Sequence, residues 1–101
     1  MNWSKREKWL MTKLGFKPQP GSGSGWLHKE DGENDALLAQ LKSTEGASIR
    51  VTREVWRDLW MHAKTSHKTP VLVLDFVDGE TLIVCRPRDM ETITQNLTLE
   101  D

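Results

Sequence analysis

The sequence has little cysteine and no long hydrophobic segment. Its single cysteine, Cys85, cannot form an internal disulfide and follows the apolar run Leu82 to Val84, which is typical of a reduced core residue and not of a catalytic thiol. No uninterrupted apolar run exceeds four residues, and the first twenty residues are polar and basic, so we expect neither a membrane span nor a signal peptide. These absences predict a cytoplasmic protein that makes no contact with a membrane.

Motifs of several common enzyme and metal sites are also absent. His28, His62 and His67 have no metal-ligand spacing among themselves and no companion cysteines, which argues against a zinc site. The nucleotide-binding pattern GxxxxGK[ST] does not occur, and the serines of the GSGSG segment at 21–25 do not fit the nucleophile elbow GxSxG. We therefore expect neither a P-loop nucleotide hydrolase nor a serine hydrolase.

The composition is that of a small folded protein. The chain has 101 residues, which is enough for one hydrophobic core and too few for two. Apolar residues make up 37% of it, and five tryptophans are available as large core fillers. We predict a single domain over residues 1–101, without internal repeats.

The positive charge of the chain is concentrated near its start. The net charge is −1, but residues 1–29 carry +5 and the remainder carries −6. The basic residues of this first third are Lys5, Arg6, Lys8, Lys13, Lys17 and Lys29. Such a cluster is compatible with a solvated helix face, but it stands just before a glycine-rich loop, so contact with nucleic acid stays open.

The hydrophobic pattern predicts an α/β fold with the element order αβββαββα. Ser4 is a candidate N-cap of a first helix that ends at Gly15, and Thr52 is the candidate N-cap of a second. The expected helices are 3–14, a segment after Thr52 and a short segment after Pro87. The expected strands are 26–29, 37–44, 48–51, 71–76 and 81–86, and Asp78-Gly79 is a hairpin turn between the last two.

Polar side chains gather on one face of the strand expected at 37–44. Gln40 and Lys42 are two residues apart and therefore share a face, and Asp31 precedes Gln40 by nine residues. A lysine beside a carboxylate and a carboxamide is poor core material, but it suits a site that holds a divalent metal and a water. The metal would polarise a phosphate oxygen, and the ammonium would stabilise the developing charge. The pattern indicates phosphodiester hydrolysis, with Asp35 as an alternative carboxylate.

The order of these features resembles the archaeal and phage Holliday junction resolvases of the PD-(D/E)xK nuclease superfamily, over roughly residues 3–76. The matching positions are Glu7, Gly15-Phe16, Gly21-Ser22-Gly23-Ser24, Asp31, and Gln40-Leu41-Lys42 followed by Ser43-Thr44. The family usually has ExK where this chain has QxK. A carboxamide oxygen still ligates a hard cation, but without the charge that supplies most of the affinity.

The resemblance implies a restriction-endonuclease-like core, in which helices flank a mixed sheet, and a Mg²⁺- or Mn²⁺-dependent endonuclease. It also implies a homodimer that cleaves branched DNA, and the small size suggests a phage or mobile-element gene whose product acts in the host cytoplasm. The implied catalytic residues are Asp31, Gln40, Lys42 and Glu7. The implied metal ligands are Asp31, Gln40 and the backbone carbonyl of Leu41. The implied DNA contacts are Ser22, Gly23, Ser24, Lys5, Arg6, Lys13 and Lys17.

Other interpretations stay open. A non-catalytic module of the same fold, binding DNA or a protein, would share the pattern, and metal binding separates the two. Glu7 could be only a surface partner of Lys8. Trp56 and Trp60 are one helical turn apart, which fits a core or dimer interface better than base stacking. His28 stands near the loop and is a candidate DNA contact.

Overall fold

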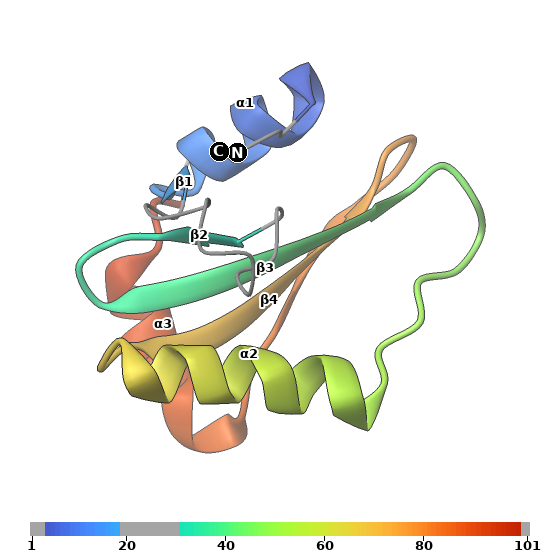
Figure 1. Cartoon of the computed structure of the whole chain (residues 1–101). Coiled ribbons are helices and arrows are strands. Elements are labelled where there is room, and N and C mark those ends of the chain that lie inside the picture. Colours follow the sequence, from blue (N-terminus) through green and yellow to red (C-terminus); the bar gives the residue numbers. More distant parts are fainter. Residues whose placement is uncertain (1–3, 19–30, 100–101) are drawn as a thin grey trace.

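The structure is a computed structural model that describes residues 4–18 and 31–99, and there the chain forms a five-stranded sheet flanked by helices (Figure 1). The helices are α1 (Lys5–Lys13), α2 (Arg53–Thr65) and α3 (Met90–Asn96), the last preceded by the 3-10 turn η2 (Pro87–Asp89). The strands are β1 (Lys17–Pro18), β2 (Asp31–Glu33), β3 (Leu37–Thr44), β4 (Thr69–Phe76) and β5 (Thr81–Val84). None of the described helices is long and apolar enough to cross a bilayer.

The strands lie in the sheet in the order in which they occur in the chain. β3 and β4 are parallel, and every other neighbouring pair is antiparallel. Parallel neighbours require a crossover connection, and α2 provides it between β3 and β4. The sheet is therefore mixed, which confirms the predicted α/β class.

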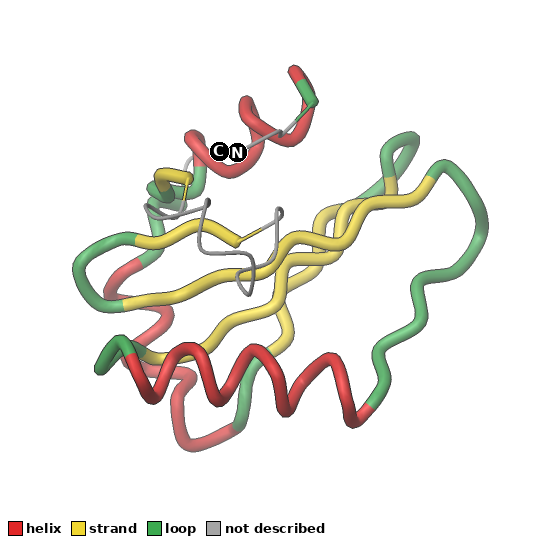
Figure 2. Tube along the Cα trace, in the orientation of Figure 1, coloured by secondary structure: helices red, strands yellow, loops and turns green. Residues whose placement is uncertain are grey.

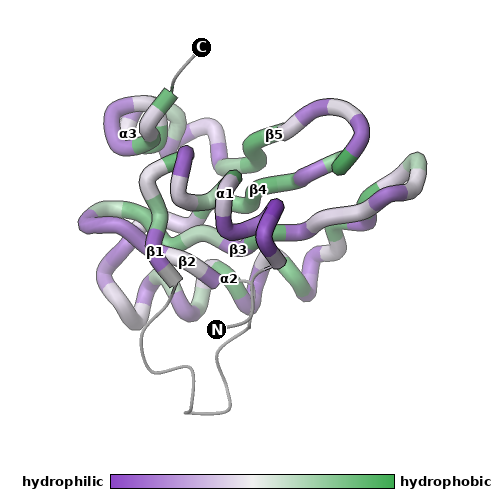
Figure 3. The backbone as a smooth tube through the Cα atoms, turned by 90° about the horizontal axis from the view of Figure 1, so that it is seen from above, coloured by the Kyte–Doolittle hydropathy of each residue, from purple (hydrophilic) through white to green (hydrophobic). Residues whose placement is uncertain are grey.

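The two central strands supply both faces of the sheet. Alternate side chains of a strand point to opposite faces, so β3 and β4 each contribute to two hydrophobic clusters. The cluster on the α1 face comprises Leu10, Met11, Phe16, Leu37, Ala39, Leu41, Val71, Val73 and Ile93 of α3. The cluster on the α2 face comprises Leu38, Leu59, Ala63, Leu72 and Leu74. Figure 3 shows β4 as a hydrophobic strand in the middle of the molecule.

Both predicted N-caps are confirmed. The Ser4 hydroxyl accepts the N–H of Glu7 at 3.2 Å, and the Glu7 carboxylate accepts the N–H of Ser4 at 3.0 Å, which completes a capping box. The Thr52 hydroxyl accepts the N–H of Val55 at 3.1 Å at the start of α2. These bonds satisfy backbone donors that the first turn of a helix leaves without intrahelical partners.

One predicted strand is wrong. Residues 48–51 belong to the loop between β3 and α2 (Figure 2), and of the four only Ile49 packs against the α2-face cluster. One inward side chain is too little apolar surface to add a strand, and the chain needs this segment to pass from the end of β3 to the start of α2. The strand expected at 26–29 lies outside the described residues. The short strands β1 and β2 were not predicted.

The C-terminal end of α1 depends on Gly15. The N–H groups of Gly15 and Phe16 bond to Thr12 and Met11 carbonyls at 3.0 and 2.9 Å, and Gly15 has φ +96°. This is the left-handed helix ending that favours glycine. A Cβ on Gly15 would also lie 2.9 Å from the Thr98 hydroxyl oxygen.

We predict that Gly15→Ala lowers the free energy of unfolding by about 1–2 kcal/mol or more, because it adds backbone strain and a close contact. Urea unfolding followed by circular dichroism measures the change. Gly79→Ala is the matched control, since its Cβ would meet only ordinary contacts of 3.7 Å and its φ is not positive. Equal stability of the two variants would contradict this account of the α1 ending.

Candidate functional site

Strands β2 and β3 place Asp31 directly opposite Gln40. In their antiparallel ladder Asp31 pairs with Gln40, and Glu33 pairs with Leu38. Side chains that are directly opposed across such a pair point to the same face and lie close together. The carboxylate and the carboxamide that the sequence singled out are therefore neighbours.

The turn between β2 and β3 maintains this register. The Asn34 side-chain oxygen accepts the N–H groups of Ala36 and Leu37 at 3.0 and 2.8 Å. From the end of α2, the Lys68 ammonium donates to the Glu33 carboxylate at 2.7 Å and to the Asn34 carbonyl at 2.6 Å. Because the turn is held on both sides, a slip of β2 along β3 would break four hydrogen bonds.

The Asp31–Gln40 pair faces α2. Leu38, Gln40 and Lys42 are two residues apart along β3, so their side chains share one face of the sheet. Leu38 packs in the α2-face cluster, which shows that this is the face covered by α2. From α2 itself, His62 reaches toward the pair, and its Nδ1 lies 3.8 Å from Asp31 Oδ2. This distance is longer than a hydrogen bond, and the contact is an ion pair only when the imidazole is protonated. The structure thus brings four polar side chains to one region.

The donor atoms present are compatible with a hard cation. Asp31 and Gln40 are 1% and 2% exposed. The Gln40 side-chain oxygen is buried and accepts no hydrogen bond from the described residues. A buried carbonyl oxygen in that state is costly, and a cation beside it would satisfy the oxygen. Among the described residues no group of three His, Cys, Asp or Glu side chains could hold a metal ion, and Glu33, the next carboxylate along β2, is paired with Lys68.

Lys42 lies at the edge of this region. It is partly exposed, stands two positions after Gln40, and is opposite Leu74 of β4. It forms no ion pair with a residue in 4–18 or 31–99. Leu41, whose carbonyl was predicted as a metal ligand, lies one residue beyond the described β2–β3 pairs, and its side chain packs on the α1 face.

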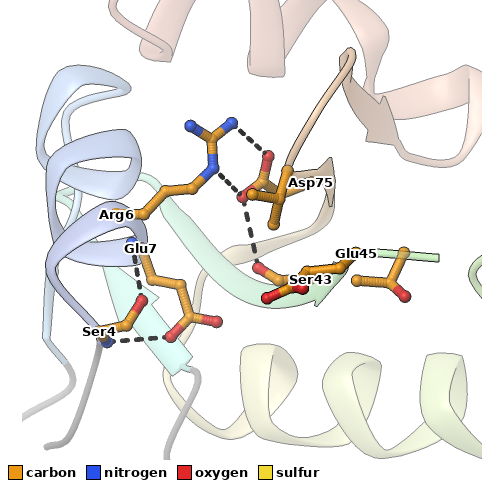
Figure 4. A pocket seen from close by; sticks show the side chains of 8 residues that line it. Ser4, Arg6, Glu7, Ser43, Glu45 and Asp75 are labelled. Atoms are coloured by element: carbon orange, nitrogen blue, oxygen red, sulfur yellow. Dashed lines mark hydrogen bonds and ion pairs between the residues drawn. The ribbon is translucent and has the colours of Figure 1, made fainter.

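Glu7 is not brought together with the other three predicted catalytic residues. It lies on α1, on the opposite face of the sheet, and its carboxylate caps its own helix (Figure 4). There it lines a pocket of about 370 Å³ together with Arg6, Ser43 and Asp75. If Glu7 and Asp31 acted on the same phosphate, that phosphate would have to contact both faces of the sheet.

Arg6 was predicted to contact DNA, but the structure assigns its guanidinium to Asp75. Arg6 Nε and Nη2 donate to the two carboxylate oxygens of Asp75 at 2.9 Å each. Asp75 is fully buried on β4, and the Ser43 hydroxyl lies 3.5 Å from it. The hydrogen bond to Asp75 raises the pKa of Arg6 above its ordinary value. Arg6 therefore links α1 to the sheet, and two of its guanidinium nitrogens are already bonded to Asp75.

The other predicted DNA contacts of the N-terminal third are solvent-facing or undescribed. Lys5, Lys13 and Lys17 are exposed, and the Lys13 ammonium lies 4.9 Å from the ring centroid of Trp9. Ser22, Gly23 and Ser24, and His28, lie outside the described residues. Asp35, the alternative carboxylate, is exposed in the β2–β3 turn.

His62 was not predicted to lie in this region, because the histidines of the chain show no metal-ligand spacing. A usable signal was its place on α2. It stands three residues after Leu59 and one before Ala63, both buried, so it lies at the border of the packed face of the helix. A titratable side chain at that border of α2 is expected to face β3, where Gln40 also lies.

Comparison of this chain with protein-family models, with curated proteins and with solved structures finds no match.

The Arg6–Asp75 geometry predicts the effect of removing the guanidinium. Arg6→Gln leaves the buried Asp75 carboxylate without its paired donors, so the melting temperature should fall. Lys5→Gln, which removes an exposed charge from the neighbouring position, should leave it nearly unchanged. Thermal unfolding by circular dichroism measures both.

A double-mutant cycle isolates the pair. Arg6→Gln combined with Asp75→Asn should cost less than the sum of the two single changes, since each single change leaves the other group unmatched. Additive effects would show that the two side chains are not coupled and that their pairing contributes nothing to stability.

Proposed function

We propose that this protein is a metal-dependent DNA endonuclease with a restriction-endonuclease-like core. The observation that carries the proposal is the register of β2 on β3, which sets Asp31 opposite Gln40 with Lys42 on the same face. A carboxylate on one strand beside a Gln-x-Lys strand is the arrangement that the resemblance to the PD-(D/E)xK nucleases implies. The element order αβββαββα agrees with the same resemblance.

The substrate we propose is branched DNA, cut by a homodimer. One chain carries one candidate site, and a junction requires two coordinated cuts on opposed strands, so two-fold pairing follows from that substrate. The exposed lysines Lys5, Lys13 and Lys17 would supply phosphate contacts, and their affinity would arise largely from counterion release.

Asp31, Gln40 and the Leu41 carbonyl would hold Mg²⁺ or Mn²⁺. When bound, the cation would supply a polarised phosphate oxygen and a water of lowered pKa. Asp31 contributes the anionic charge, and Gln40 contributes a neutral oxygen, which favours weaker binding than two carboxylates would give. His62 lies beside Asp31, with its Nδ1 3.8 Å from Asp31 Oδ2.

Lys42 would act as the charge-stabilising group. Its side chain is partly exposed, so the ammonium reaches solvent at the edge of the buried pair. A fixed positive charge near a phosphate favours the transition state, where negative charge accumulates, more than the ground state.

One observation favours a second candidate, a non-catalytic module of this fold that binds DNA or a protein. Asp31 and Gln40 are almost completely buried beneath α2, and no group of three His, Cys, Asp or Glu side chains among the described residues could hold a metal ion. A catalytic metal must be reached by a phosphate and a water. Cleavage assays and metal titration separate the two candidates.

We predict that Lys42→Ala and Asp31→Asn each abolish cleavage and leave DNA binding intact. The first removes charge stabilisation in the transition state, and the second removes the anionic ligand. Labelled junction, flap and duplex DNA are incubated with magnesium, manganese or chelator, and binding is measured in chelator. Asp35→Asn, an exposed change in the adjoining turn, is the matched control and should cleave normally. Cleavage by Asp31→Asn at the wild-type rate would sink the assignment.

A second test concerns the unusual ligand. Gln40→Glu adds a carboxylate opposite Asp31, so it should lower the magnesium concentration needed for half-maximal cleavage. An active wild type whose metal requirement does not change would show that residue 40 is not a ligand. If the wild type is inert with every metal and Gln40→Glu cleaves, the natural protein is the non-catalytic module.

A further inference from the structure

One side of α2 carries a row of basic and aromatic side chains. Arg53 and Arg57 are four residues apart, as are Trp56, Trp60 and Lys64, so these five residues lie along one side of the helix. We call these five residues the α2 stripe. Members four residues apart are about 6 Å apart along the helix axis.

The α2 stripe borders a surface pocket. The pocket has a volume of about 320 Å³ and is lined by Arg53, Trp56, Arg57, Trp60 and Arg86. Arg86 follows β5 and donates to Asp89 at 2.8 Å. Two aromatic rings and three guanidinium groups thus surround one hollow.

Only part of the pocket's positive charge is neutralised by the described residues, because Arg86 is paired with Asp89 at 2.8 Å. Arg53 and Arg57 are exposed and form no ion pair with a described residue. Of the acidic residues of the helix, Asp58 is turned about 100° away from Arg57 around the axis, whereas Glu54 is three residues before Arg57 and lies nearer to it. The pocket is complementary to an anion.

The two tryptophans differ in their packing against the hydrophobic core. Trp56 packs against the α2-face cluster. Trp60 is half-buried and belongs to neither hydrophobic cluster, and the Lys64 ammonium lies 5.0 Å from its ring centroid. A ring of this size at the surface, beside exposed arginines, is what single-stranded nucleic acids bind by stacking.

We propose that the α2 stripe binds a single-stranded or unpaired segment of DNA. The phosphates lie against Arg53 and Arg57, and a base stacks on Trp60. The stripe is separate from the candidate catalytic region, because His62 is about 200° around the helix from Trp60. This binding does not depend on whether the chain cleaves DNA.

A second copy of the chain fits the stripe less well than DNA does. A two-fold contact centred on the stripe would place it against itself and bring arginines of both copies together. Like charges that meet in this way are repulsive, whereas a phosphate chain neutralises them.

Fluorescence anisotropy with a labelled oligothymidylate, in chelator, tests the proposal on the full chain. Trp60→Ala should weaken binding about tenfold, and Trp60→Phe, which keeps a ring, should weaken it less. Arg57→Gln should reduce the slope of log K against log salt by about 0.7, as loss of one single-strand phosphate contact requires. Met61→Ala, an exposed neighbour outside the pocket, and Arg50→Gln, an exposed arginine before α2, are the matched controls.

Three results would overturn the proposal. The first is a wild type that does not bind the oligothymidylate, or a Trp60→Ala variant that binds it as tightly as wild type does. The second is a Trp60→Ala variant that loses as much affinity for blunt duplex DNA as for the oligothymidylate. That result would mean that the stripe contacts only the DNA backbone. The third is a Trp60→Ala variant that becomes monomeric by light scattering with its DNA affinity unchanged, which would make the stripe a self-association surface.

Failure of this proposal is distinguishable from failure of the proposed nuclease. If Trp60→Ala loses the oligothymidylate and the wild type cleaves no DNA with any metal, the stripe stands and the nuclease falls. If Lys42→Ala abolishes cleavage and Trp60→Ala binds the oligothymidylate as tightly as wild type does, the nuclease proposal stands and the stripe proposal fails.

Discussion

The alternation of side chains along β3 is the constraint on which the rest of the structure depends. This strand is central, parallel to β4 on one side and antiparallel to β2 on the other, so neither edge is free to shift. Its odd-numbered positions from Leu37 to Leu41 bury against α1 and α3, and its even-numbered positions face α2. Gln40 therefore cannot leave the α2 face without exposing the core.

The same constraint explains what could be predicted from the sequence. The common face of Gln40 and Lys42 follows from strand period alone, and the caps at Ser4 and Thr52 follow from local hydrogen-bonding chemistry. The place of Asp31 does not follow in this way, since it depends on a register held by Asn34 and a lysine from another element. Register is a tertiary property, and spacing in the sequence does not give it.

The positions of Glu7 and Arg6 could not be predicted, for one physical reason. Glu7 and Arg6 are adjacent on a basic, polar helix. Composition alone could not show which of them forms an ion pair with a buried side chain. The deciding residue, Asp75, lies in an apolar run of β4 that reads as a core strand. A carboxylate at such a position must be paired, and Arg6 is the residue that pairs with it. Long-range ion pairs of this kind are the least predictable part of a sequence.

The contacts of α1 also have a kinetic consequence. Arg6 and Asp75 are 69 positions apart, and the Leu14 carbonyl accepts the N–H of Thr98, still farther along the chain. The unit β3–α2–β4 is made of nearer neighbours, so its loops close at a lower entropic cost. We expect α1 to dock last and to be released first in native-state hydrogen exchange, as a unit of low local stability. Opening of that layer would uncover the α1 face while β2, β3 and α2 keep Asp31, Gln40 and His62 in place.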